Sequence, residues 1–294
     1  MTSWTTTPIT GTFGLELSGG RLDDAVDAAW VRGLLDEHRV IVARDQHLSP
    51  AEQVSLARAF GEPTPAHPVV PGRPGTRDPR PRRRRRRSQR PLAHRCHVHA
   101  HPTGGVRPRE RRDARVRRRH LLGRHTDGVR PVARVVARRV DGLEAVHRIS
   151  PLAYWGEPFD TALDRADAQR LYDDAQQVPP VIHPVVRVHP TTGRRNLFVN
   201  PGFTTHVVGM SRIESDGLLA LLYAHMFQPE FTMRHRWRAG DVVVWDNRTT
   251  AHYAIDDYGS ATRRMRRVTV RGTTPVGPTG TESRIATDAL VAVR

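Results

Sequence analysis

The sequence has no lysine, a single cysteine and no long apolar run. Because Cys96 has no second cysteine to pair with, an internal disulfide framework is excluded and a reducing compartment is favoured. No segment reaches the roughly 18 consecutive apolar residues that suggest a membrane-spanning helix. The N-terminal residues Met1 to Thr12 lack the basic and apolar regions of a secretory signal. We therefore expect a soluble cytoplasmic protein that does not enter a membrane.

Positive charge is concentrated in one part of the chain. The formal net charge of +17 and the isoelectric point near 11.4 would ordinarily suggest a nucleic-acid-binding protein. Between Pro71 and Val140, however, 24 arginines face 4 acidic residues, a balance of +20, so that the rest of the chain carries −3. Outside this stretch the composition is that of an ordinary, mildly acidic enzyme.

The same stretch lacks aromatic residues. Residues 71–140 contain no Phe, Trp or Tyr, whereas the flanking regions hold all 17 aromatic residues of the chain. Arginine is unbroken from Arg82 to Arg87, and the apolar residues follow neither a helical nor a strand period. Such a segment buries too little apolar surface to offset the entropy lost on ordering. We therefore expect residues 72–140 to be disordered.

Three origins of this segment are open: an arginine-rich nucleic-acid arm, a disordered linker, or a shifted reading frame. The 47 arginines without lysine indicate a GC-rich gene, whose out-of-frame translation yields Arg, Pro, Gly, Ala and His. Read one base forward with plausible codons, residues 92–101 become W-H-T-D-V-T-F-T-P, and residues 116–130 give fragments that include S-G-G-D-T and A-Y-D. Proteins that bind single-stranded nucleic acid interleave aromatic residues with basic ones, and none occur here. We favour the shifted frame.

The flanks predict a mainly β protein with flanking helices. The apolar spacing and turn residues predict helices at 22–37, 49–60, 161–177 and 214–225, and strands at 40–43, 184–189, 196–199, 231–237, 242–245 and 267–272. The helix at 49–60 opens with the capping box Ser49 to Glu52. Short strands with helices outside them indicate a jelly-roll, or double-stranded β-helix (cupin-like), barrel. We expect a single domain over 1–275, interrupted at 72–140, and a loose C-terminal tail over 276–294.

His252 is the main candidate for chemistry. It follows a predicted buried strand and a polar turn, although a single histidine is more often structural than catalytic. Arg263 and Arg267 follow it, and two guanidinium groups beside a histidine suit a dianionic ligand. The alternative is a solvated basic face formed with Arg264 and Arg266.

The segment 246–254, with Arg263 and Arg267 at their spacing, resembles the C-terminal signature of the taurine dioxygenase (TauD/TfdA) family. The segments 183–190 and 197–205 are similar to the same family, as are residues 44–46 and 67–70. The resemblance covers about 1–72 and 141–275. In the shifted reading, W-H-T-D lies where this family carries its first histidine and its aspartate.

The resemblance implies an Fe(II)- and 2-oxoglutarate-dependent dioxygenase with a 2-His-1-carboxylate triad. His252 would be the distal iron ligand, and Arg263 would pair with the far carboxylate of 2-oxoglutarate. Arg267 and His67 would bind the head group of a small anionic organosulfur substrate. Hydroxylation by O2 would release sulfite or sulfate and an aldehyde. Val70 stands where taurine-specific members often carry Tyr, which admits longer alkyl sulfonates or sulfate esters, and a homo-oligomer is expected.

The chain departs from this family at its catalytic centre. As it stands it lacks the proximal histidine, the carboxylate ligand and the threonine of G-G-D-T. We therefore predict that this polypeptide binds iron poorly and is inactive. The alternatives are an arginine-rich nucleic-acid-binding protein and a degenerate barrel without catalysis.

Overall fold

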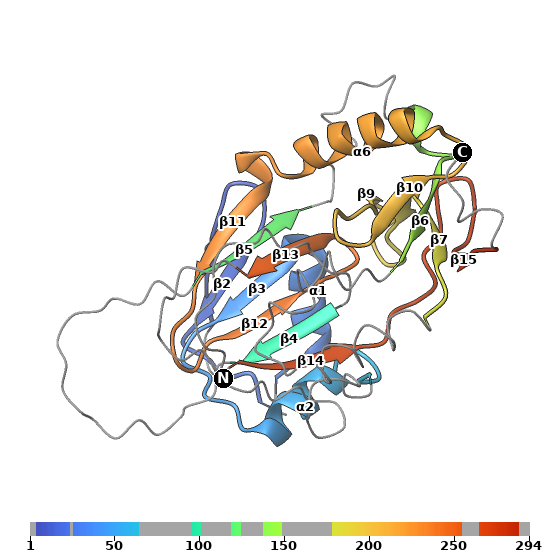
Figure 1. The fold of residues 1–294 in the computed structure, drawn as a ribbon. Coiled ribbons are helices and arrows are strands. Elements are labelled where there is room, and N and C mark those ends of the chain that lie inside the picture. Colours follow the sequence, from blue (N-terminus) through green and yellow to red (C-terminus); the bar gives the residue numbers. More distant parts are fainter. Residues whose placement is uncertain are drawn as a thin grey trace, which may run out of the picture.

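The computed structural model describes residues 4–23, 26–64, 96–100, 119–124, 138–148, 178–254 and 265–287. In these residues β-strands dominate, and the helices lie on the outside of the sheets (Figure 1). Among the described helices, none is both long enough and apolar enough to cross a membrane.

The N-terminal part supplies strands and both helices of one layer. It comprises β1 (Thr5–Pro8), β2 (Leu15–Ser18), α1 (Ala28–His38), β3 (Val40–Ala43) and α2 (Pro50–Arg58). The Asp27 side chain caps α1 by accepting from the backbone N–H of Ala29 at 2.8 Å. At α2 the Ser49 hydroxyl and the Glu52 carboxylate exchange hydrogen bonds with each other's backbone N–H groups. The predicted capping box is therefore confirmed.

A six-stranded sheet forms the larger layer, in the order β1-β2-β3-β12-β4-β14. Its C-terminal strands are β12 (Val242–Trp245) and β14 (Arg266–Val270), and β4 (Cys96–Ala100) lies hydrogen-bonded between them. One face of this sheet packs against α1 and α2 through a core that includes Ile41, Val244 and Val268. Helices therefore seal one side of the sheet and leave the other for the barrel interior.

A three-stranded sheet faces that interior, in the order β11-β5-β13. It consists of β11 (Thr232–Arg236), β5 (Arg119–Arg124) and β13 (Thr250–Ala254). A second core joins the two layers, because Met233 of β11 packs in one cluster with Val42, Val243 and Trp245 of the six-stranded sheet. Two facing layers around such a core, antiparallel at every pairing except that of β2 with β3, confirm the predicted jelly-roll.

A further sheet and the longest described helix complete the molecule. The sheet has the order β10-β6-β7-β15, formed by β10 (Thr204–Val207), β6 (Glu144–His147), β7 (Val181–Pro184) and β15 (Arg284–Ile285). The hairpin of β8 (Val186–Val188) and β9 (Arg195–Leu197) follows β7, and η2 (Pro229–Phe231) precedes β11. Helix α6 (Arg212–Met226) packs on β10 and buries Leu219 and Leu222.

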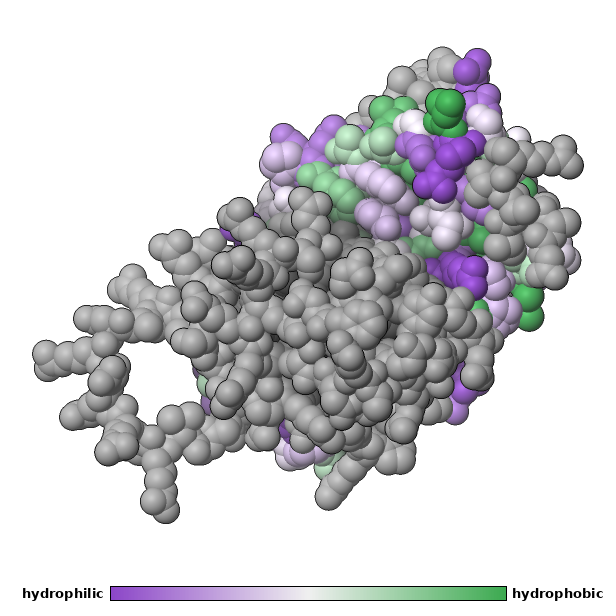
Figure 2. Space-filling model, viewed as in Figure 1, coloured by the Kyte–Doolittle hydropathy of each residue, from purple (hydrophilic) through white to green (hydrophobic). Residues whose placement is uncertain are grey.

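The outer side of α6 combines apolar and charged residues. Ile213 and Leu221 are exposed there by 86% and 51%. The Nε of Arg212 donates to Asp216 at 2.7 Å on the same helix. In the space-filling view, hydrophobic and strongly hydrophilic residues lie side by side in the upper part of the molecule (Figure 2).

The structure differs in part from two expectations from the sequence. The expected disorder over 72–140 does not hold for Cys96–Ala100 and Arg119–Arg124, because each of these strands pairs with a neighbouring strand on both edges. Residues 72–95, 101–118 and 125–137 lie outside the described residues. The physical reason is that β12 and β14 each present hydrogen-bonding groups that require a partner whatever its side chains are. The tail is not loose over 276–287, since β15 pairs with β7. The predicted helix at 161–177 lies outside the described residues.

Candidate active site

His252 enters the barrel interior from β13. In the register of the three-stranded sheet, His252 and Met233 both stand opposite position 122, so they share one face of the sheet. Met233 belongs to the core between the two layers. The His252 ring centroid lies 5.0 Å from that of Trp245, on the opposite layer. Burial lowers the pKa of His252 to about 4, so the imidazole is neutral at physiological pH, as a metal ligand must be.

Arg267 reaches the same interior from β14. Its neighbours Arg266 and Val268 lie on the helix-covered face, where Arg266 donates to the backbone oxygen of Leu48 at 2.8 Å. Because side chains alternate along a strand, Arg267 lies on the other face of the sheet. Position 99 of β4 pairs with both Arg267 and Val243, so these two residues share that face. It is half-buried, and no described residue forms a hydrogen bond or ion pair with its guanidinium. A partly buried cation of this kind favours an anionic ligand.

The structure therefore brings together two of the four site residues predicted from the sequence. His252 and Arg267 face one interior from opposite layers. Arg263 and His67, and likewise Val70, lie outside the described residues. The roles assigned to all four remain predictions.

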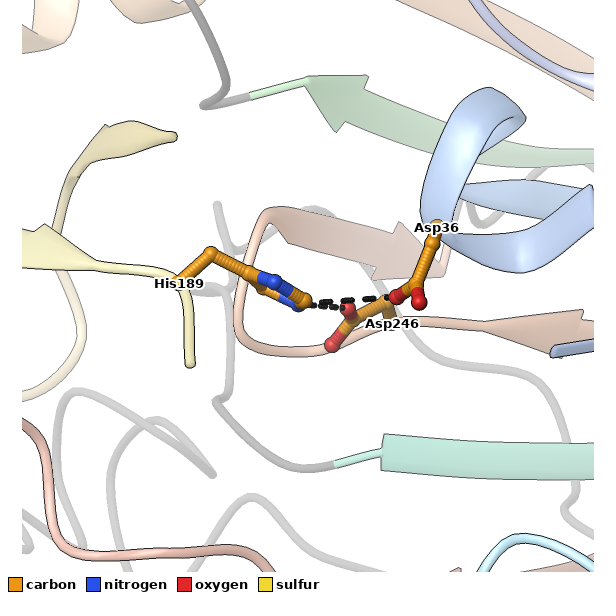
Figure 3. Close-up of side chains that lie close together, drawn as sticks. All are labelled: Asp36, His189 and Asp246. Atoms are coloured by element: carbon orange, nitrogen blue, oxygen red, sulfur yellow. Dashed lines mark hydrogen bonds and ion pairs between the residues drawn. The ribbon is translucent and has the colours of Figure 1, made fainter. Parts of the chain in front are cut away.

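A second cluster lies where α1, the hairpin and the turn after β12 meet (Figure 3). Asp36 of α1, His189 after β8 and Asp246 after β12 have their polar atoms within 4.8 Å of one another. His189 Nε2 lies 2.8 Å from Asp246 Oδ2 and 3.9 Å from Asp36 Oδ1. A histidine and two carboxylates at this spacing are the residue types of a metal centre.

The hydrogen bonds argue against a metal centre. His189 Nδ1 accepts from the backbone N–H groups of Thr191 and Thr192 at 3.3 and 3.1 Å. The proton of the neutral ring must then sit on Nε2, which donates to Asp246 and has no lone pair to offer a metal ion. Both oxygens of Asp246 accept from the Arg248 guanidinium, at 2.8 and 2.9 Å. We therefore interpret the cluster as an ion pair supported by hydrogen bonds.

The charge state of Asp246 agrees with this interpretation. Its carboxylate is fully buried, and burial alone would raise its pKa. The hydrogen bonds from His189 and Arg248 outweigh burial and hold the pKa of Asp246 well below its usual range. Asp246 is thus a buried carboxylate whose charge is already balanced within the protein.

The donor set of the described residues does not fit a complete 2-His-1-carboxylate site. His252 is a suitable ligand in position, burial and charge state. The histidine and carboxylates of the second cluster are engaged with each other and with Arg248. His189 and Asp246 lie in the segments 183–190 and 246–254 that resemble the family, but no role could be assigned to either residue from the sequence. Asp36 had no signal, because a single acid on an amphipathic helix looks like any solvated residue.

Comparisons with known proteins agree with one another. The model of the taurine catabolism dioxygenase TauD, TfdA family matches residues 5–131 and 132–269. The chain is 35% identical to an alpha-ketoglutarate-dependent sulfate ester dioxygenase of Pseudomonas putida, over 94% of this chain and 92% of that protein. It is 31% identical to an alkylsulfatase of Acinetobacter baylyi, over 94% and 87%. The crystal structure of a taurine dioxygenase from Burkholderia xenovorans superimposes with a TM-score of 0.77 at 29% identity, covering 98% of each chain.

Proposed function

Because this chain belongs to the taurine catabolism dioxygenase TauD, TfdA family, and is thereby a 2-oxoglutarate-dependent dioxygenase, we propose that its substrate is a small alkyl sulfate ester or sulfonate. The observation that carries the proposal is Arg267, a half-buried cation on the interior face that His252 also enters. The two full-length relatives named for sulfate ester and alkylsulfate chemistry support the same substrate class.

Arg267 would bind the anionic head of the substrate. A sulfate or sulfonate group presents several equivalent oxygens, which match the forked donors of a guanidinium. The core residues Val243 and Trp245 exclude water from the same face, so the ion pair would be stronger there than at the surface. An alkyl chain would extend from this head group along the apolar interior and bring its first carbon toward His252.

The overall reaction balances with O2 and 2-oxoglutarate. One oxygen atom of O2 is inserted into a C–H bond of the carbon that carries the sulfur group. The other oxygen atom is incorporated into 2-oxoglutarate, which is converted to succinate and CO2. The hydroxylated carbon then collapses to an aldehyde, and the sulfur group leaves as sulfate from an ester or as sulfite from a sulfonate. Fe(II) supplies the activation of oxygen in this family, and we assign His252 as one of its ligands and Arg263 as the partner of 2-oxoglutarate.

The missing ligands are part of the same proposal. We infer that residues 72–140 are read in a shifted frame and that the correct frame carries W-H-T-D and G-G-D-T. Strand β4 is compatible with this, because both readings place apolar residues at 96 and 98, on the helix-covered face, and the shifted reading replaces the histidines at 97 and 99 by β-branched threonine, which favours a strand. The chain as it stands places Cys-His-Val-His-Ala there, whereas the shifted reading gives V-T-F-T. W-H-T-D would then directly precede β4.

The test begins with resequencing of the gene across codons 65–145 and peptide mass spectrometry of the product. The chain as it stands and a version with the shifted segment corrected, the frame-restored chain, are then assayed for succinate and sulfate or sulfite with alkyl sulfates, alkyl sulfonates and taurine. We expect turnover by the frame-restored chain alone. Turnover by the uncorrected chain at a similar rate would refute the frame proposal.

The substrate head group is tested in the frame-restored chain with Arg267→Ala. Loss of a charge-assisted hydrogen bond costs about 1.5–3 kcal/mol, so kcat/KM for the alkyl sulfate should fall roughly 10- to 100-fold. Arg212→Ala removes an arginine from the surface of α6 and serves as the matched control. An unchanged kcat/KM in Arg267→Ala would exclude Arg267 from the anion site.

A further inference from the structure

The buried ion pair of Asp246 lies immediately before the strand that carries His252. We propose that Asp246, held by His189 and Arg248, is a positioning residue that fixes the direction in which His252 enters the barrel. This inference rests on the proposed function, in which His252 binds the metal. It assigns a role to a cluster that lies outside the interior face and that offers no metal site of its own.

The turn between β12 and β13 is held by hydrogen bonds to the backbone and side chain of Asp246. Its backbone N–H donates to the Arg39 oxygen at 3.0 Å. Its backbone oxygen accepts from the Thr249 N–H at 3.1 Å and from the Thr250 hydroxyl at 2.7 Å. Its side chain also accepts from the backbone N–H of Arg248 at 2.8 Å. Because Thr250 begins β13, the conformation of Asp246 sets the start of the strand two residues before His252.

The side-chain bonds connect this turn to two other parts of the molecule. His189 belongs to the β8–β9 hairpin, and its ring is oriented by the backbone N–H groups of Thr191 and Thr192. Asp36 belongs to α1, and its carboxylate lies 3.7 Å from Arg248 Nη2. His189 and Asp246 are fully buried. A buried network of this kind admits one arrangement, since loss of one partner leaves the others unpaired in a medium of low dielectric constant.

Trp245 provides a natural reporter of the turn. It precedes Asp246 in the chain and His252 follows it, and the rings of Trp245 and His252 lie 5.0 Å apart at an interplanar angle of 56°. The Trp245 indole N–H donates to Asn247 Oδ1 at 2.8 Å, which fixes the indole within the same turn. A change in the turn would therefore change the ring-current shift that Trp245 imposes on His252.

The test uses the metal-free full chain labelled with 15N-histidine, in which the imidazole signals are followed by NMR at a temperature well below unfolding. In Asp246→Asn and His189→Leu we expect the His252 signals to move toward those of an unfolded histidine. The signals of the buried His147 and His235 and of the half-buried His183 should stay in place. His189→Gln keeps an N–H donor near the position of Nε2 and should restore the His252 signals. Asp216→Asn, which breaks a surface ion pair on α6, is the matched control.

Each outcome decides the proposal. Unmoved His252 signals in both Asp246→Asn and His189→Leu would overturn it. So would a joint loss of dispersion of all buried histidines in both variants, because the network would then hold the fold as a whole. Since the measurement needs no metal and no turnover, a frame-restored chain without activity would refute the proposed function and leave the positioning result standing.

Discussion

His183 is a half-buried histidine away from the candidate site. It lies on β7, with its ring centroid 4.7 Å from that of His147 and 5.1 Å from that of Phe198. Its Nδ1 is 2.7 Å from the Ser283 hydroxyl, which ties the C-terminal segment to the sheet. Burial, with a smaller contribution from the nearby Arg187, lowers the pKa of His183 to about 4 from 6.5.

This lowered pKa predicts sensitivity to acid. The unfolded chain takes up the proton first, so the stability that neutral His183 contributes is present above about pH 6.5 and is lost as the pH falls toward 4. Between pH 7 and pH 5 the difference amounts to roughly 2 kcal/mol. Urea unfolding at both pH values should show that His183→Asn loses less stability than the unmodified chain. Equal losses in the two proteins would contradict the assignment.

At the scale of elements, local signals were sufficient for some features and insufficient for others. The helix cap at Ser49 could be predicted from the sequence because its hydrogen bonds join residues that are three apart in the chain. Strand β4 could not be predicted from the sequence, because its place in the sheet depends on pairing with β12 and β14, which come more than 140 residues later in the chain. The Asp36–His189 contact has the same origin, since its partners are brought together only by the fold. His252 and Arg267 could be proposed from the sequence because their spacing along the chain matches a family pattern, although β13 and β14 lie in different sheets.

The cap of α2 gives a prediction for a single element. Ser49→Ala removes the hydroxyl that accepts from the Glu52 N–H and leaves the first turn of the helix without its cap. The free energy of unfolding should fall by about 1 kcal/mol. Chemical denaturation measures this loss, and Ser49→Asp, which retains a capping oxygen, should recover most of it. A loss of the same size in Ser49→Asp would show that the cap is not the cause.

For the whole molecule, the uneven charge has a measurable consequence. Residues 71–140 carry +20 and the remainder carries −3. The chain as it stands should therefore bind heparin, and salt should release it, as for any generic polyanion contact. The frame-restored chain should pass through the same column. Retention of the frame-restored chain at equal salt would contradict the view that the basic character comes from the shifted segment.

The order of strands in the six-stranded sheet also bears on how the chain is made. Strand β3 is buried and pairs on one edge with β2, but its other partner, β12, ends at Trp245. About 200 residues separate the two strands, which corresponds to tens of seconds at a synthesis rate of about 5–20 residues per second. During that interval the apolar edge Val40–Ala43 is open on the ribosome. The nascent chain is therefore expected to need protection of this edge from other chains until translation is nearly finished.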